Sequence, residues 1–411
     1  MEKRRVVITG LGGITPVGHD IFTSWNAIKE GKCGIAPITN FDASQLKAKL
    51  AAEVKDFDPK AYIDRREVIH MDRSTQFAVI AADEAYKMSG ISSENTDLNR
   101  CGVIVSSGIG GLQTLQNECI KGHEKGWERI SPFFIPMVIS NMPAGQIAIK
   151  FGFKGMCVSP VAACAGGGNA VGDAFRHIRD GYADVMLCGG TEATITPLGI
   201  GGFSSMKALS FSEDKERASI PFDKERNGFV MGEGSVMLML EELSHAQNRG
   251  ANILGEIVGY GATCDAYHVT APHPEGEGGK KCMIGAIEDA GLTVNDIGYI
   301  NAHGTSTPMN DMCETKAIES VFGEKAKSIP VSSTKSVTGH MLGAAGAIES
   351  AVCILALREG FIPPTINYKV PDEECDLDIV PNVGRKTGFE YALSNSLGFG
   401  GHNTCLIFKK F

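Results

Sequence analysis

The segment at residues 156–180 constrains the fold of this chain more than any other stretch. It reads MCVSPVAACAGGGNAVGDAFRHIRD, so a short apolar run ends at Cys164, three glycines follow, and apolar residues then recur at helical spacing. This pattern predicts a strand, a sharp turn and a helix. A cysteine at such a turn lies beside the unpaired N–H groups at the start of the helix, which favour its thiolate. We therefore expect Cys164 to be a nucleophile with a lowered pKa, although a small apolar core residue is a sound alternative for any single cysteine.

Strand and helix patterns alternate along the rest of the chain. Residues 5–9 and 101–106 read as strands, and residues 21–30 and 75–88 read as helices. Such alternation predicts an α/β protein with a largely parallel, buried sheet. A hydrophobic content of 43% in 411 residues is enough for one large core. Residues 203–234 are polar, rich in turn formers and followed directly by an apolar run, which favours a long functional loop over a linker.

A weak internal repeat divides the chain into two halves. CGVIVSSGIGG precedes the Cys164 turn in the first half, and IGYINAHGTST precedes STKSVTGHMLGAAGAIESAVCILALREG in the second. Each later segment runs from a glycine-rich turn into a helix of small residues. We predict a duplicated fold, with halves at residues 1–250 and 251–411 that share one core. Cys164 and His340 then occupy related places, and two helix N-termini face one another across a pseudo-twofold axis.

Charge and cysteine usage exclude several classes of protein. The net charge of -9 gives no general attraction to nucleic acid or to an anionic membrane, and no apolar run is long enough to span a bilayer. The twelve cysteines are scattered without a CxxC pair, which argues against zinc and against a disulfide scaffold. We expect reduced thiols and a cytoplasmic protein. The amino terminus, MEKRRVVITGLGGITPVG, reads as a first strand and turn because its apolar part is too short for a signal peptide.

Three further segments have the character of a site. They read NAHGTST from Asn301, KSVTGH from Lys335 and NSLGFGGHN from Asn395. A lone histidine at a strand end is more often a satisfied core residue than a catalyst. His303 and His340, however, both lie among glycine and hydroxyl residues at turns, as the cysteine does. We therefore expect the three residues to form one site.

These motifs resemble those of β-ketoacyl-acyl-carrier-protein synthases of the type II elongating group, which are condensing enzymes of the thiolase superfamily. The resemblance covers essentially the whole chain, and its most specific motifs are NAHGTSTPMND, SSTKSVTGHMLGAAGAIES and NSLGFGGHN. It implies an α/β, thiolase-like fold of two duplicated halves with a five-layered α-β-α-β-α architecture. It also implies acyl carrier protein as a partner and no cofactor, because the substrates travel on the carrier's 4'-phosphopantetheine.

The resemblance implies a decarboxylative condensation. Cys164 would accept an acyl group, while His303 and His340 would promote decarboxylation of malonyl-carrier protein and stabilise the enolate. The N–H groups of Cys164 and Phe399 would form an oxyanion hole. Lys335 would orient the polar network, although a buried structural cation paired with Glu349 is an equal alternative.

Other positions match the family residue by residue. Phe399 matches a gating aromatic whose flanking glycines allow it to move. The matching acyl-pocket and pantetheine or malonyl positions are Ile109, Phe203, Thr305, Thr307 and Gly400. The positions that match a structural monovalent cation site, which the reaction itself would not require, are Asn301, Glu349, Asn395 and Ser396. The basic residues left for docking the acidic carrier protein are Arg65, Arg66, Arg73 and Lys207.

The chain departs from the family in two places. Ala162 and Pro160 precede the nucleophile where the family usually has a hydroxyl residue and an N–H donor, and glycines follow it where a hydroxyl is common, so we expect a more flexible turn. Near the docking site, Ile69 stands where basic residues are usual. This suggests either weaker docking or a specialised carrier protein in a polyketide-like pathway.

Two other functions remain open on the sequence. A thiolase acting on acyl-CoA would need a second cysteine, and Cys405 is late enough in the chain, but its apolar strand reads as core. A chain-length-setting partner subunit of a heterodimeric ketosynthase would lack the nucleophile, which is present here. The resemblance further implies a dimer, expected to be a homodimer although a heterodimer is an alternative, with Phe133 and Phe134 near the interface.

Overall fold

The computed structural model describes residues 3–411, in which ten strands form one continuous sheet in the order β10-β9-β13-β14-β8-β1-β7-β6-β4-β5. The two central strands, β1 and β8, pair antiparallel, with Val6 opposite Ile257. Each half of the sheet repeats the same order of its own strands, so the chain is duplicated as the repeat predicts. The strands of the first half are β1 (Val6–Ile14), β4 (Cys101–Ser106), β5 (Cys157–Val158), β6 (Val185–Glu192) and β7 (Gly234–Glu242), and those of the second are β8 (Gly255–Cys264), β9 (Ile297–Asn301), β10 (Val331–Ser332), β13 (Tyr391–Gly398) and β14 (His402–Lys409).

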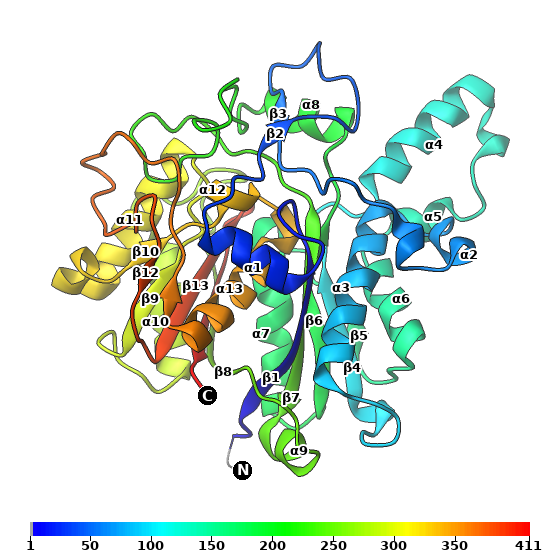
Figure 1. Cartoon of the computed structure of the whole chain (residues 1–411). Coiled ribbons are helices and arrows are strands. Elements are labelled where there is room, and N and C mark those ends of the chain that lie inside the picture. Colours follow the sequence, from blue (N-terminus) through cyan, green and yellow to red (C-terminus); the bar gives the residue numbers. More distant parts are fainter. Residues whose placement is uncertain (1–2) are drawn as a thin grey trace.

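Helices cover both half-sheets and fill the space between them (Figure 1). One apolar core joins the middle helices to both half-sheets, and two further cores join each half-sheet to its outer helices. The molecule therefore has five layers, α-β-α-β-α, as a thiolase-like fold requires. The outer helices of the first half are α3 (Arg73–Ser89) and α6 (Met142–Phe151), the middle helices are α7 (Gly166–Arg179) and α13 (Ala345–Glu359), and the outer helices of the second half are α10 (Glu277–Asp289) and α11 (Pro308–Phe322).

The sheet is mixed, so the prediction of a largely parallel sheet is wrong. Strand β14 follows β13 through a tight turn at residues 399–401, and a turn this short forces an antiparallel pair. The equivalent strand β7 is likewise antiparallel to β6 and to β1. The parallel pairs lie toward the outer edges, between β4 and its two neighbours and between β9 and its two neighbours.

Strand β1 is longer than its apolar run because glycines continue it. A Cβ on Gly10 would lie 2.1 Å from the carbonyl oxygen of Ala85, and one on Gly12 would lie 2.0 Å from that of Ala81. These glycines therefore let α3 pack against the backbone of the strand, where the sequence reads as a turn. At the other end of the chain, Gly360 ends α13 in the left-handed conformation at φ 62°, as expected of a helix C-cap.

The remaining elements lie around the sheet. The polar segment after α8 is irregular from residue 206 to residue 233, slightly shorter than the predicted loop because the helix runs to Ser205. No helix within residues 3–411 combines the length and the apolar content needed to cross a bilayer. The proposed boundary at residue 250 falls between α9 and β8 and stays a prediction. The other helices and strands are α1 (Ile21–Lys29), α2 (Arg65–Val68), α4 (Leu112–Lys125), α5 (Phe134–Val138), α8 (Pro197–Ser205), α9 (Leu243–Asn248), α12 (Lys335–Thr338), β2 (Ala36–Pro37), β3 (Leu50–Ala51), β11 (Phe361–Ile362) and β12 (Arg385–Lys386).

Candidate active site

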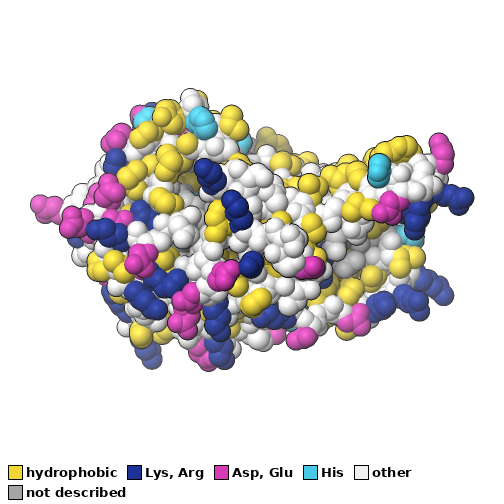
Figure 2. Space-filling view, turned by 90° about the horizontal axis from the view of Figure 1, so that it is seen from above, with side chains coloured by type: hydrophobic (Ala, Val, Ile, Leu, Met, Phe, Trp, Pro, Cys, Tyr) yellow, Lys and Arg dark blue, Asp and Glu magenta, His cyan; other side chains and the backbone are white. Residues whose placement is uncertain are grey.

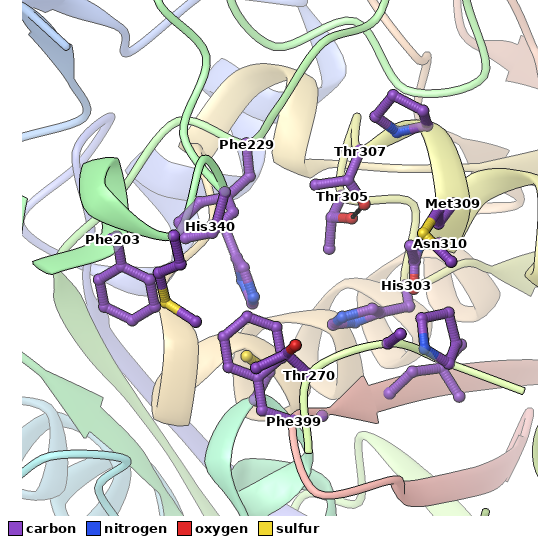
Figure 3. Close-up of a pocket in the computed structure, with 18 of the residues that line it drawn as sticks. Phe203, Phe229, Thr270, His303, Thr305, Thr307, Met309, Asn310, His340 and Phe399 are labelled. Atoms are coloured by element: carbon purple, nitrogen blue, oxygen red, sulfur yellow. Dashed lines mark hydrogen bonds between the residues drawn. The ribbon is translucent and has the colours of Figure 1, made fainter. Parts of the chain in front are cut away.

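One cavity of about 300 Å³ brings the predicted nucleophile and both predicted histidines together. Figure 3 shows the imidazole rings of His303 and His340 pointing toward a common space that is bordered by Thr305 and Phe399. The residues that line the cavity come from distant parts of both halves. They are Cys164, Phe203, Met206, Lys207, Ala208, Phe229, Asp265, Thr270, Ala271, Pro272, His303, Thr305, Thr307, Pro308, Met309, Asn310, His340, Leu397, Gly398, Phe399 and Asn403.

Cys164 lies in a short 3-10 turn, η4 (Ala163–Ala165), directly before α7. Ala163 has a φ of 47°, a conformation that a non-glycine residue rarely adopts and that is common at functional sites. The thiol is buried, and burial raises the pKa of Cys164 to about 12. The expectation of a lowered pKa is therefore wrong. The backbone N–H groups of Cys164 and Phe399 do favour the thiolate, but the loss of hydration outweighs them.

The glycines after Cys164 are packed tightly, so the expectation of a flexible turn is also wrong. They form the buried first turn of α7. A Cβ on Gly166 would lie 2.1 Å from the Ser106 hydroxyl, and one on Gly168 would lie 2.3 Å from the Thr404 hydroxyl. The same Ser106 hydroxyl donates to the carbonyl oxygen of Pro160 at 2.8 Å, which ties down the residue whose N–H is missing.

The turn that is equivalent to Cys164 in the second half contains Gly343, not His340. The turn η6 (Leu342–Ala344) leads into α13 as η4 leads into α7, and Leu342 has a φ of 45°, close to that of Ala163. Matching the two turns pairs Cys164 with Gly343. His340 lies three residues earlier, so the predicted equivalence of Cys164 and His340 is wrong by that offset. The two helix N-termini do meet, because a Cβ on Gly346 would lie 2.4 Å from the nitrogen of Gly168.

His303 follows β9 and is held through its backbone. Its N–H donates to Glu314 at 2.8 Å, and the neighbouring Gly304 N–H donates to the other oxygen of the same carboxylate at 2.8 Å. Lys335 Nζ donates to the His303 carbonyl oxygen at 2.5 Å. Burial, followed by the charge of Lys335 and by His340, lowers the pKa of His303 well below its usual value. The imidazole is therefore neutral near pH 7.

His340 is held in the same way from the other side of the cavity. Its N–H donates to the carbonyl oxygen of Val230 at 2.7 Å, and its own carbonyl accepts the Gly232 N–H at 2.8 Å. The edge of its ring meets Phe229, with centroids 5.2 Å apart. Burial, and then the charge of Lys335, lowers the pKa of His340 well below its usual value. Two neutral imidazoles therefore face one space, each with Nδ1 unpaired among residues 3–411.

Lys335 lies behind the cavity and does not line it. Its ammonium group pairs with the buried carboxylate of Glu349 as well as with the His303 backbone. This geometry agrees with the structural alternative for Lys335, which acts on the site through His303 and through its charge. Burial raises the pKa of Glu349 to about 7.

The residues of the expected cation site lie together only in part. Asn301 Oδ1 and Glu349 Oε2 are buried oxygens without a hydrogen-bond donor among residues 3–411, which fits a cation ligand. The Ser396 side chain lowers the pKa of the Glu349 carboxyl, which burial raises. Asn395, in contrast, directs its Nδ2 to Glu314 at 3.3 Å.

Phe399 begins the turn between β13 and β14. Its ring centroid lies 6.4 Å from that of Phe203, and both rings line the cavity. Gly400 and Gly401 follow with φ values of 84° and 76°, so only glycine suits this turn. The Gly400 N–H donates to the carbonyl oxygen of Val269 at 2.7 Å, which joins the turn to a neighbouring loop.

The expected substrate-binding residues divide into two groups. Thr305 and Thr307 line the cavity, and their hydroxyls are 2.9 Å apart. Ile109 and Gly400 do not line it. Ile109 is 41% exposed in the glycine-rich loop that follows β4. The expectation that these two residues form its wall is therefore not met.

The docking residues also divide. Arg65 and Arg66 are exposed at the start of α2, and Lys207 is exposed at the mouth of the cavity. Arg73 does not belong with them, because its guanidinium is paired with buried Glu233 at 2.7 Å and packs over two phenylalanine rings. Figure 2 shows further Lys and Arg side chains on the projecting lobe that carries α2 and α4 (Figure 1).

Several residues of the site had no clear signal in the sequence. Phe229, Thr270 and Asn310 reach the cavity from separate loops and from the first turn of α11, so only the fold brings them there. Glu314 had a signal, because it shares the buried face of α11 with Asp311 at a three-residue spacing. Two acidic residues on the buried face of a helix indicate that their carboxylates accept hydrogen bonds from buried backbone N–H groups nearby.

Known proteins resemble the chain over its whole length. Residues 3–246 match the family described as Beta-ketoacyl synthase, N-terminal domain, and residues 254–369 match Beta-ketoacyl synthase, C-terminal domain. The chain is 52% identical to 3-oxoacyl-(acyl-carrier-protein) synthase 2 of Synechocystis sp. over 412 residues, which cover 100% of this chain and 99% of that protein. It is 50% identical to the protein of the same name from Staphylococcus aureus over 410 residues, with 100% and 99% covered.

A solved structure shares the fold. It is described as a type II PKS acyl-carrier protein in complex with its ketosynthase bound to the hexaketide, and its matching chain is 35% identical with a TM-score of 0.93 over 100% of both chains. These matches agree with the duplicated five-layered architecture. The chain belongs to the beta-ketoacyl synthase family.

Proposed function

We propose that this enzyme condenses malonyl-acyl carrier protein with an acyl group held on Cys164, with loss of CO2, and so elongates a fatty acid or related chain by two carbons. One observation carries the proposal: a buried thiol and two neutral imidazoles, from His303 and His340, line the same cavity. The names of the relatives at about half identity agree with this C–C bond-forming acyl transfer.

In the first half-reaction, the Cys164 sulfur attacks the carbonyl carbon of the acyl thioester. The new S–C bond forms as the bond to the pantetheine sulfur breaks, and the proton of Cys164 leaves on the released pantetheine thiol. The carbonyl oxygen carries negative charge in between. The N–H groups of Cys164 and Phe399 favour negative charge on the thiol sulfur, and the same groups are placed to stabilise this oxyanion.

In the second half-reaction, malonyl-carrier protein loses CO2 and its electron pair forms an enolate. The enolate oxygen accepts hydrogen bonds from His303 and His340, each of which is a neutral imidazole with one N–H group to donate. The enolate carbon then attacks the acyl carbonyl on Cys164, a C–C bond forms, and the cysteine sulfur leaves. These steps need no dissociable cofactor, since both substrates are carried on 4'-phosphopantetheine.

The carrier protein is the proposed partner. Thr305, Thr307 and Lys207 border the cavity and suit the amide and phosphate groups of the pantetheine arm. Phe399 suits a gate, because its ring lines the cavity near that of Phe203 and its backbone N–H favours the Cys164 thiolate. Exposed Arg65 and Arg66 suit docking of an acidic protein. A structural monovalent cation among Asn301, Glu349, Asn395 and Ser396 is part of the same proposal.

A homodimer in the cytoplasm completes the proposal. The edge strand β5 is exposed at Val158, and the neighbouring segment exposes Phe133, Ile135 and Ile139, with Phe134 half-buried beside them. An apolar surface beside an open sheet edge suits pairing with a second copy. A heterodimer with a related partner remains the alternative.

The alternative functions have less support. Cys405 is fully buried in β14, within the outer core of the second half, and does not line the cavity. The wall of the cavity therefore lacks the second cysteine that a thiolase would need. A partner subunit without activity would not need the nucleophile. That the enzyme uses a specialised carrier protein stays a separate prediction. Ile69 is 63% exposed near Arg65 and Arg66. If Ile69 weakens docking of a housekeeping carrier protein, Ile69→Arg should raise activity with that carrier.

Intact mass tests the proposed function. The purified protein is incubated with an acyl-carrier protein thioester, beside Cys164→Ala, and then with malonyl-carrier protein. We expect the wild type alone to gain one acyl mass and to release it as a β-ketoacyl product. If neither protein is acylated by housekeeping or pathway carrier proteins, the proposal is wrong and the partner-subunit alternative takes its place.

A further inference from the structure

Glu192, the last residue of β6, is a fully buried carboxylate that the proposed reaction does not use. Its Oε2 accepts the N–H groups of Gly108 at 2.7 Å and of Gly343 at 3.0 Å. Its Oε1 accepts the Ser107 hydroxyl at 3.1 Å and the Ile109 N–H at 3.3 Å. Among residues 3–411, no ion pair includes Glu192. The carboxylate therefore holds one loop of the first half and one turn of the second by neutral donors.

The contact between Glu192 and Gly343 corresponds, in the duplicated fold, to the contact between Gly398 and Cys164. Gly343 occupies the place in η6 that Cys164 occupies in η4. Glu192 and Gly398 end equivalent strands, β6 and β13, so they are counterparts as well. At the active site a Cβ on Gly398 would lie 3.2 Å from the Cys164 nitrogen, and glycine leaves that position open. At the duplicated turn η6, the Glu192 carboxylate occupies the corresponding position and accepts the N–H group of Gly343.

Gly343 is connected to both His340 and Cys164, to the first through the chain and to the second through packing against α7. It follows His340 by three residues, and its carbonyl oxygen would lie 2.8 Å from a Cβ on Gly167, which follows Cys164 by three residues. The same oxygen would lie 2.2 Å from a Cβ on Gly190 in β6. With so little free space, a shift of Gly343 must be passed to the turns on both sides.

The charge of Glu192 affects the pKa of Cys164. The titratable groups that act on Cys164 or share its cavity come from several segments. They are Lys335 from α12, Glu192 from β6, the neutral rings of His303 and His340, and Lys207 and Asp265 in the cavity wall. The ammonium of Lys335 lowers the pKa of Cys164, and the carboxylate of Glu192 raises it. Burial raises the pKa of Glu192 itself to about 7, so the group is largely ionised above neutral pH.

We propose that Glu192 is a positioning residue of the active site, which holds Gly343 against the first turn of α7 and so sets the position of Cys164 relative to His340. The part of the proposal that concerns condensation rests on the proposed function. The part that concerns the environment of the thiol does not.

Glu192→Gln tests the proposal, because it keeps the shape of the side chain but removes the charge and one acceptor. The amide NH2 then faces an N–H donor, and Gly343 loses its anchor. We expect the kcat of condensation to fall by about tenfold or more, since small displacements of reacting groups are costly. At pH 8, loss of the negative charge should raise the rate of Cys164 alkylation by iodoacetamide about threefold or more and shift its pH profile downward.

General loosening of the fold would also slow condensation and would expose the buried thiol of Cys164 to the reagent. A control variant that loses a similar amount of stability therefore separates positioning from damage. Glu84→Gln is the matched control, because Glu84 also has a pKa raised to about 7 and also accepts backbone N–H groups. Its donors, Gly13 and Ile21, lie outside η6, and Glu84 is not among the charges that shift the pKa of Cys164. We expect it to lose a similar amount of thermal stability and to change both rates by less than about twofold.

Other outcomes would overturn the proposal. They are an unchanged kcat in Glu192→Gln, a fall in alkylation together with kcat, or the same pair of changes in Glu84→Gln. If Glu192→Gln does not fold, Ser107→Ala removes one donor to the same carboxylate and should give smaller changes in the same two directions. If the wild type itself does not condense, the proposed function fails, and the alkylation profiles still decide whether Glu192 acts on Cys164.

Discussion

The imidazole rings of His303 and His340 meet edge to face, with centroids 5.3 Å apart and planes at 85°. Each histidine comes from a different part of the second half and is held by hydrogen bonds of its own backbone N–H and C=O groups. Because burial keeps both rings neutral, their N–H groups are able to point at one oxygen without mutual charge repulsion. This pair is suited to an oxygen that gains charge only during the reaction.

Removing either imidazole should separate the two half-reactions. In His303→Ala or His340→Ala, one donor to the enolate is lost, and we expect the condensation rate to fall by about 10²–10³-fold. Acylation of Cys164 should persist, because the oxyanion hole comes from backbone N–H groups. Product formation and the acyl mass on the protein measure the two steps. Loss of acylation in both variants, with condensation reduced no further, would contradict this division.

The buried histidines should also make the protein less stable in mild acid. Their pKa values are lowered in the folded protein, so below about pH 6.5 the unfolded chain binds protons that the folded chain does not. Stability is therefore lost as the pH falls. Compared with His340→Ala, the wild type should lose about 1.4 kcal/mol of unfolding free energy between pH 7.5 and pH 5.5. Urea unfolding at both pH values measures this, and an unchanged difference would refute it.

Lys335 and Glu349 should stabilise the fold only as a pair. Lys335→Met leaves the Glu349 carboxylate buried without its cation, and we expect the unfolding free energy to fall by about 3–5 kcal/mol. Lys335→Met combined with Glu349→Gln should recover more than half of that loss, because no buried charge remains. Urea unfolding of the two variants provides the comparison. If the double variant is no more stable than Lys335→Met, the unpaired charge of Glu349 is not the cause of the lost stability.

The contact between the two middle helices should not tolerate a methyl group. Gly346→Ala would place Cβ 2.4 Å from the Gly168 nitrogen, so α13 and α7 must separate, at a cost of about 1–3 kcal/mol. Gly285→Ala is the control, because no described atom lies within 4 Å of the added Cβ in α10. It should gain about 0.5–1 kcal/mol from helix propensity. Equal effects of the two substitutions on the thermal midpoint would argue against tight packing.

The basic residues should differ in their effect on the carrier protein. Arg65→Ala with Arg66→Ala should raise the KM for the carrier and weaken its salt dependence without changing stability, since both side chains are exposed. Arg73→Ala leaves buried Glu233 unpaired and should cost about 3 kcal/mol of stability. Steady-state kinetics at two salt concentrations, with urea unfolding, distinguish these roles. A stability loss in the first variant would place Arg65 or Arg66 among the structural residues instead.

The sequence by itself determined the local part of this protein. The strand, turn and helix around Cys164, the duplicated halves, and the grouping of the thiol with His303 and His340 all follow from periodicity and from glycine-rich motifs. These features depend on neighbours along the chain, and the resemblance to a family supplied the layered fold.

Only the tertiary structure decided how each group behaves. It raised the pKa of Cys164 instead of lowering it, because burial removes more hydration than a helix N-terminus restores. It paired Arg73 with Glu233 and left Ile109 exposed and outside the wall of the cavity. It also brought Glu192 to Gly343 across 151 residues of sequence. Burial and long-range contacts are properties of the packed layers, and no linear pattern encodes which backbone N–H group a distant carboxylate will meet.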